Sequence, residues 1–101
     1  MRILVMFDLP VITACDRREY AKFRKYLLKS GFLMIQESVY CKLAPNSGMA
    51  DSIIENLKKN KPEKGIVQAL KITEKQYERM EYIVGSHHSE VLDTDERLVL
   101  L

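Results

Sequence analysis

Cysteine is scarce in this sequence. Cys15 and Cys41 are the only two among 101 residues, and their separation fits no metal-ligand spacing. Disulfides persist mainly in oxidising compartments, whereas cytoplasmic thiols stay reduced. We therefore expect two reduced, packed thiols in a cytoplasmic protein rather than a disulfide.

Long apolar runs are also missing. No run approaches the roughly 20 residues of a membrane-spanning helix, and the N-terminus lacks the pattern of a signal peptide. The composition, 47% hydrophobic and 30% charged, is typical of a soluble globular protein. At 101 residues, the chain is expected to form one domain with a modest core and no membrane contact.

The net charge of +2 is unevenly distributed along the chain. The last twelve residues sum to −3, which leaves +5 on the body of the chain. The charged residues of this tail are Glu90, Asp93, Asp95, Glu96 and Arg97. A basic body followed by an acidic tail favours a polyanionic partner for the body.

The first strand organises the rest of the chain. Five apolar residues run from Ile3 to Phe7, and Pro10 closes the segment, which predicts a central strand buried on both faces. Asp8 follows at the carboxyl end, where sheets often present functional groups. A carboxylate here needs water, a helix N-terminus or a metal ion as partner. The alternative is that Asp8 begins a turn or caps the next segment.

A helix is predicted from about residue 15 to residue 30. Thr13 and Asp16 have the spacing of a capping box, and Gly31 is a typical stop signal. At about 100° per residue, Tyr20, Phe23 and Leu27 share one face, which should pack on the sheet.

The rest of this helix is basic. Arg18, Lys22, Lys25 and Lys29 form a stripe opposite the apolar face, with no acidic partner among its members at i+3 or i+4. Two arginines lie on the flank. A solvated helix face is the alternative, but so many cations in register favour phosphate binding. The predicted nucleic-acid-binding residues are Arg17, Arg18, Lys22, Arg24 and Lys25.

The middle of the chain predicts strands 32–36 and 38–43 with a tight turn near Gln36-Glu37. A single kinked strand is the alternative, because no Gly or Asn marks a hairpin. A helix over residues 49–60 should begin at a cap on Asn46 or Ser47. Its expected buried residues are Met49, Ile53, Ile54 and Leu57.

The remaining signals predict a strand over residues 65–72 and a short helix from Glu74 to about Met80, capped by Thr73 with Gln76. Residues 82–84 should extend this helix or form a brief strand. His87 and His88 are predicted to be exposed loop residues rather than metal ligands.

Strand, helix, strand, strand, helix, strand is the order of the ferredoxin-like βαββαβ fold, an α+β architecture. It gives an antiparallel sheet with two helices on one face and a bare, apolar second face. Such a face needs a partner, so we expect a homodimer packed sheet to sheet. We expect residues 1–84 to form this domain and residues 85–101 to form a C-terminal loop and strand used in assembly.

Several segments together carry a resemblance to a known family. They are Phe7-Asp8-Leu9-Pro10, Tyr20-Ala21-Lys22-Phe23-Arg24-Lys25-Tyr26-Leu27-Leu28, Gly31-Phe32, Gln36-Glu37-Ser38-Val39-Tyr40-Cys41-Lys42-Leu43, Lys64-Gly65, Thr73-Glu74-Lys75-Gln76-Tyr77 and Asp95-Glu96-Arg97-Leu98-Val99. The chain resembles the small, second universal protein of CRISPR spacer acquisition, in the form found in type II systems. These segments span nearly the whole chain in the right order, which makes the match specific.

The resemblance implies a ferredoxin-like homodimer that bridges dimers of a larger integrase subunit and supports duplex prespacer DNA for insertion into the CRISPR array. It also implies Mg²⁺-dependent endonuclease activity, with Asp8 as metal ligand and catalytic residue near the dimer axis. The C-terminal segment would join the subunits of the complex. Its partner-binding residues would be Arg97, Leu98, Val99, Leu100 and Leu101.

Two functions of different classes follow. In the enzyme hypothesis, Asp8 and its symmetry mate hold one Mg²⁺ for phosphodiester hydrolysis of DNA or RNA, and Ser38 and Tyr40 approach from the neighbouring strand. In the scaffold hypothesis, which we favour, basic side chains grip DNA phosphates and the integrase does the chemistry. A third possibility is a toxin-type ribonuclease of the same fold or a generic RNA-binding module. The RNA-binding module is disfavoured because the sequence has no aromatic-rich, RNP-like strand.

Overall fold

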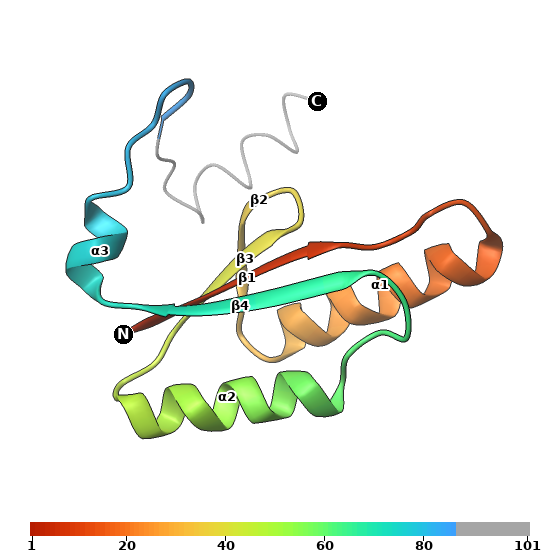
Figure 1. Cartoon of the computed structure of the whole chain (residues 1–101), viewed down its shortest axis with the longest axis horizontal. Coiled ribbons are helices and arrows are strands. Elements are labelled where there is room, and N and C mark those ends of the chain that lie inside the picture. Colours follow the sequence, from red (N-terminus) through yellow and green to blue (C-terminus); the bar gives the residue numbers. More distant parts are fainter. Residues whose placement is uncertain (87–101) are drawn as a thin grey trace.

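The computed structural model describes residues 1–86 and contains a four-stranded antiparallel sheet in the order β2-β3-β1-β4. The elements are β1 (Arg2–Asp8), α1 (Ala14–Lys29), β2 (Leu33–Gln36), β3 (Val39–Leu43), α2 (Ser47–Lys59), β4 (Ile66–Ile72) and α3 (Glu74–Glu78). Helices α1 and α2 cover one face of the sheet, and α3 lies beyond the other face (Figure 1). The predicted α+β, ferredoxin-like βαββαβ fold is confirmed.

Strand β1 is central, as predicted. It pairs with β3 on one side and with β4 on the other. Ile3 and Val5 are fully buried in the core beneath the helices, and Leu4 is buried on the opposite face. An unbroken apolar run suits such a strand because both of its faces leave water.

Both ends of α1 follow from local signals in the sequence. The Thr13 hydroxyl accepts the Asp16 N–H at 3.0 Å, and the Asp16 carboxylate accepts the Thr13 N–H at 3.1 Å, which confirms the capping box. The helix ends before Gly31, whose φ of +92° is a conformation that favours glycine. Lys42 of β3 donates to the Ser30 carbonyl and so ties this helix end to the sheet.

Strands β2 and β3 form a hairpin, so the alternative of one kinked strand is wrong. The turn comprises Glu37 and Ser38, one residue later than predicted. Ser38 has a φ of +65°, which a tight hairpin turn requires and which costs a non-glycine residue energy. Ser38 therefore occupies the turn position at which Gly or Asn is usual, which is why the sequence contains no hairpin signal.

Helix α2 begins at the predicted cap, where the Asn46 side chain accepts the Met49 N–H at 2.9 Å. Leu57 is buried and Ile53 and Ile54 pack against the core, as expected. Met49 was expected to be buried, but its side chain is 48% exposed. The buried stripe is centred on Ala50, Ile54 and Leu57, so Met49 lies at its margin in the first turn.

The second sheet face is not bare along its whole length, which corrects the prediction. Tyr77 of α3 and Met80, just beyond it, pack at one end of this face, against a buried cluster of Leu4, Cys41 and Ile72. Four side chains of this face remain more than half exposed: Leu33, Leu43, Ile66 and Leu70. The apolar surface available to a partner is therefore smaller than the sequence suggests, and Leu33 and Leu43 border a cleft that α3 also lines.

The segment after α3 differs from both alternatives considered. Residues 82–84 form neither helix nor strand, and Ile83 and Val84 are each 89% exposed. With so little of either side chain covered, burial does not favour a regular element there. The predictions for His87, His88 and the terminal strand fall outside the described residues, and the domain boundary after residue 84 stays a prediction.

The two cysteines have different surroundings. Both are free thiols, as expected, and Cys41 is buried. Cys15 was expected to be packed but is exposed, because it lies in the first turn of α1 away from the stripe of Phe23 and Leu27. None of the described helices is long and apolar enough to cross a membrane.

Candidate nucleic-acid interface and carboxylate site

The Asp8 side chain lies at the carboxyl end of β1, directly opposite Ile66 of β4, and is exposed. Strand alternation places it on the second sheet face, together with Leu4 and Met6. Its carboxylate has no hydrogen bond or ion pair within residues 1–86. Thr13 caps α1 instead, so the alternative that Asp8 is a cap is wrong.

Two neighbouring elements press close to the backbone at Asp8. The Phe7 N–H donates to the Ser38 carbonyl at 3.1 Å, which brings the hairpin turn beside the end of β1. On the other side, a Cβ added to Gly65 would lie 2.6 Å from the Asp8 carbonyl oxygen, and the φ of Gly65 is +90°. The close approach of residue 65 to the Asp8 backbone therefore requires a glycine, which has no Cβ.

Ser38 and Tyr40 were both predicted to approach Asp8, but only Ser38 lies near it. Ser38 lies next to the end of β1, as its backbone hydrogen bond shows. Tyr40 is wrong for this role, because it is 1% exposed and stacks on Phe7 with ring centroids 5.6 Å apart. Tyr40 pairs with Val5 of β1, which is buried beneath the helices, so the Tyr40 side chain points to the same face of the sheet and into the core.

One chain provides a sparse metal site. No group of three or more His, Cys, Asp or Glu side chains occurs in the part of the chain that the structure describes. Mg²⁺ in proteins often keeps several waters and uses one or two carboxylates. Asp8 is exposed and has no partner among the described residues, so its carboxylate is available as one such ligand.

The basic side chains of α1 form an exposed surface. Arg18, Lys22, Arg24 and Lys25 are all exposed, and none has an ion pair or side-chain hydrogen bond to a described residue. The positive charge of this helix is therefore available to a polyanion. Phe23 and Leu27 are buried on the opposite side and Tyr20 packs beside them, as predicted.

Arg17, the fifth predicted residue, has a different role in the fold. Its Nη1 donates to the carbonyls of Ile12 at 2.9 Å and Val11 at 3.3 Å. The guanidinium therefore holds the loop before α1 in place, and fewer of its donors remain for phosphate.

Sequence reasoning missed Arg2. Its Nε donates to Glu74 Oε2 at 2.8 Å, and its guanidinium lies 4.0 Å from the centroid of the Tyr77 ring. These contacts hold α3 over the end of the sheet and over Cys41, and burial there raises the pKa of the Cys41 thiol. No sequence signal links residues 72 positions apart.

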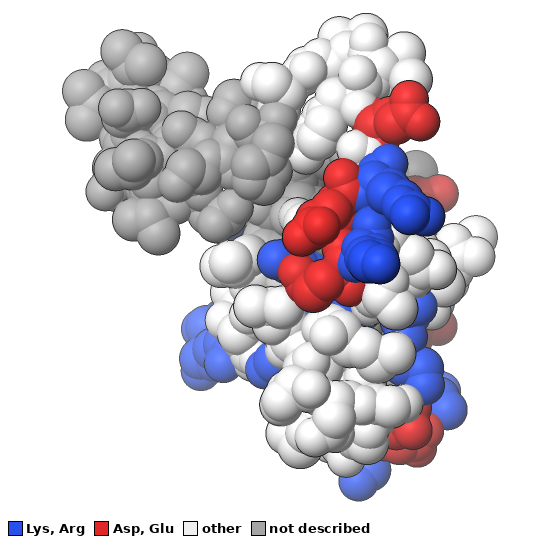
Figure 2. All heavy atoms as spheres, turned by 90° about the vertical axis from the view of Figure 1, so that its left-hand side faces the viewer, with Lys and Arg blue, Asp and Glu red and all other residues white. Residues whose placement is uncertain are grey.

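The surface over α3 differs from that of α1. Figure 2 shows acidic and basic side chains interleaved there, as the alternating charges of Glu74, Lys75, Glu78, Arg79 and Glu81 imply. Mixed charge of this kind partly cancels. Among the described residues, the basic side chains of α1 therefore give a net positive surface, whereas the charges around α3 largely offset one another.

The fold and these surfaces define a small ferredoxin-like α+β domain with a basic first helix and a lone carboxylate at the end of its first strand. The family model described as CRISPR associated protein Cas2 matches residues 1–80. A relative from Treponema denticola, named "CRISPR-associated endoribonuclease Cas2", is 56% identical over 100% of both chains.

Relatives of the same name show similar agreement. One from Streptococcus mutans is 46% identical over 100% of this chain and 93% of its own. Another from Ligilactobacillus salivarius is 44% identical over 100% of both. The chain belongs to the Cas2 family of CRISPR-associated proteins.

Proposed function

We propose that this protein acts in CRISPR spacer acquisition as a homodimer in the cytoplasm, which supports duplex prespacer DNA and bridges dimers of the larger integrase subunit. Membership of the Cas2 family supports the biological setting. The observation that carries the DNA-binding part is the α1 surface, whose cations have no counter-ion among the described residues.

The length of this surface suits a nucleic-acid backbone. Arg18 and Lys29 are eleven positions apart on one helix, which at 1.5 Å per residue is about 16 Å. That is about five times the 3.4 Å per charge along one strand of duplex DNA. Side chains that contact phosphates in this way position DNA without reading its sequence, as a scaffold for spacers of any sequence requires.

The homodimer is supported by the second sheet face. Leu33, Leu43, Ile66 and Leu70 are each more than half exposed there. Exposed apolar patches on small domains mark interaction sites, and a second copy would cover this one with the same residues. Two copies packed in this way would also bring two exposed Asp8 carboxylates to one interface, where Mg²⁺ could be shared.

A second candidate function is phosphodiester hydrolysis, favoured by one observation: relatives of this chain are named endoribonucleases. A Mg²⁺ ion held by Asp8 and its symmetry mate would activate water and offset charge on the scissile phosphate. Asp8 would hold the ion, and the strained turn at Ser38 lies beside it. Purified protein incubated with RNA and with duplex DNA, with and without Mg²⁺, tests this candidate. Asp8→Ala should abolish any genuine activity.

The basic surface provides the test of the main proposal. Replacing Arg18, Lys22 and Lys25 by Glu should weaken binding of duplex DNA by the complex with the integrase and flatten its salt dependence, because fewer counterions are released. For every phosphate that the variant no longer neutralises, the slope of log K against log salt should fall by about 0.9. An unchanged slope would mean that this helix face is merely solvated.

A further inference from the structure

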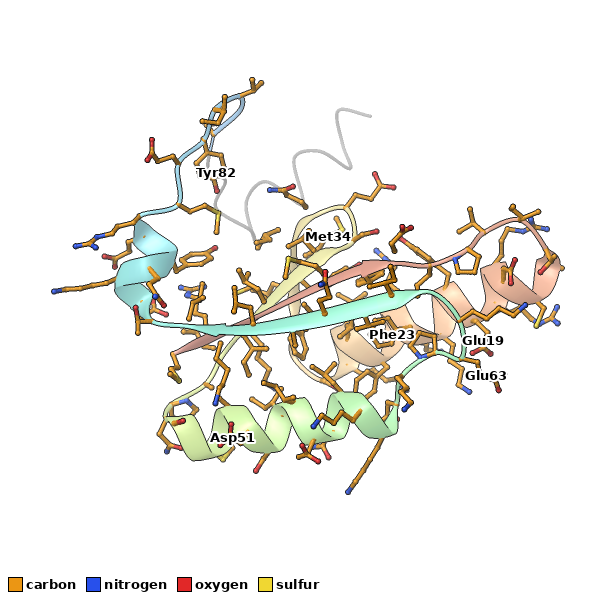
Figure 3. All side chains as sticks on the ribbon, viewed as in Figure 1. Glu19, Phe23, Met34, Asp51, Glu63 and Tyr82 are labelled. Atoms are coloured by element: carbon orange, nitrogen blue, oxygen red, sulfur yellow. The ribbon has the colours of Figure 1, made fainter. Side chains whose placement is uncertain are left out.

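A groove lies between the middle of α1 and the end of α2. Its lining residues are Glu19, Lys22, Phe23, Lys59, Asn60, Lys61 and Pro62. Figure 3 labels Glu19 and Phe23, which lie one turn apart on α1 beside the loop that follows α2. Because Lys22 also belongs to the basic surface of α1, the groove continues that surface onto a second helix.

The charge of this groove is strongly unbalanced. Three lysines line it against one carboxylate, Glu19. Lys22, Lys59 and Lys61 are exposed, and none has an ion pair or hydrogen bond within residues 1–86.

Other lysines nearby do have partners. Lys58 donates to Glu55 at 2.9 Å, and Lys71 donates to Asp51 at 2.7 Å. Within residues 1–86, carboxylates are therefore supplied to Lys58 and Lys71 but not to the lysines of the groove.

The dipole of α2 does not account for these charges. Cations in the last turn of a helix offset its negative end, and Lys58 and Lys59 occupy that turn. Lys61, however, follows the C-cap residue Asn60, and Lys22 belongs to another helix. Two of the three groove lysines thus need a different explanation.

We propose that this groove is a second phosphate-binding strip, so that the backbone of duplex DNA is held by α1 and by the α2–β4 loop together. The inference rests on the proposed DNA-supporting function and adds residues 59–61 to its contact surface. The occupant is a nucleic-acid backbone rather than a protein, because the groove is lined mainly by charged and polar groups. It lacks the aromatic or arginine anchors that dominate protein interfaces, apart from Phe23, which is buried.

The test uses the full chain in complex with the integrase and a short duplex, with affinity measured by fluorescence anisotropy at several salt concentrations. The double variant Lys59→Gln/Lys61→Gln should lower the salt slope by up to about 1.8, so that the fall in affinity between 50 and 200 mM salt shrinks by roughly 12-fold. Both side chains are exposed, so the fold should be unaffected.

Two matched variants sharpen the result. Glu19→Gln removes the single carboxylate of the groove and should tighten DNA binding, which a damaged fold cannot do. Lys58→Gln/Lys71→Gln removes the same charge from two lysines that already have carboxylate partners, and it should leave the slope almost unchanged.

Three outcomes would overturn the inference. If Lys59→Gln/Lys61→Gln binds DNA normally while the charge-reversed α1 variant does not, the groove does not bind DNA but the proposed function stands. If neither variant changes binding, the proposed function fails as well. If the groove variant fails to co-elute with the integrase on size exclusion but still binds DNA, the lysines contact an acidic protein surface.

Discussion

Replacing Leu70 by lysine should convert the proposed homodimer into a monomer without unfolding the domain. Leu70 lies in the middle of β4, on the second sheet face, opposite Leu4 of β1. Its side chain is 51% exposed in the isolated chain. A lysine there can extend its ammonium group into water in the monomer, so the free energy of unfolding should fall by only about 1 kcal/mol.

In a sheet-to-sheet dimer the same change is costly. Full burial of a leucine contributes about 1.5–3 kcal/mol, so the exposed half contributes about 1 kcal/mol per copy. The lysine must also give up part of its hydration, which adds at least about 1 kcal/mol. Because a symmetric dimer contains both copies, the sum is about 4 kcal/mol, or nearly a thousandfold in the dissociation constant.

Light scattering at micromolar concentration measures this effect. The wild-type chain should have about twice the 11.8 kDa monomer mass, and Leu70→Lys should have the monomer mass. Ala69→Lys is the matched control, since it adds the same charge at the next position of β4, on the other face of the sheet. A wild-type monomer, or a Leu70→Lys protein that is still dimeric, would refute the reasoning.

Two further predictions concern folding and assembly. Gly65→Ala should lower the free energy of unfolding by about 2–4 kcal/mol, a loss of at least about 8 °C in Tm, because the new Cβ would lie 2.6 Å from the Asp8 carbonyl oxygen. Gly85 has the same φ of +90°, but a Cβ there meets nothing within 4 Å, so Gly85→Ala should lower the Tm far less. Equal losses of Tm in the two variants would contradict the clash at Gly65. Deleting residues 91–101 removes the apolar run Leu98-Val99-Leu100-Leu101 and the acidic residues before it. The truncated domain should fold but no longer co-elute with the integrase on size exclusion, because the apolar run is expected to join a sheet edge of the complex. Normal assembly of the truncated protein would contradict this role of the tail.

Much of the fold could be predicted because its signals are local. The capping residues Thr13 and Thr73 each act on an N–H three positions away, and the apolar run of β1 indicates its own burial. The order of these elements then restricts the sheet to few topologies. Helix and strand boundaries accordingly lie within about two residues of those predicted.

The errors involve contacts between distant parts of the chain. Tyr40 carries a hydroxyl that would suit an active site, but it lies on the side of β3 that faces the core, where its ring stacks on Phe7. The cover over the second sheet face depends on Arg2 contacting Glu74 and Tyr77, which no spacing rule reveals. Asp8 was proposed as a site residue from its position after the first strand, whereas the close approach of Gly65 to its backbone was not predicted.

The role of Asp8 decides between scaffold and enzyme. The most direct measurement is spacer acquisition in cells that carry Asp8→Ala in place of the wild-type protein. The exposed carboxylate has no partner within residues 1–86, so the variant should fold and assemble with the integrase, as co-elution can verify. Our account predicts near-normal acquisition together with loss of any Mg²⁺-dependent cleavage by the purified protein. Loss of acquisition with fold and assembly preserved would contradict the scaffold proposal and make hydrolysis at Asp8 the main function.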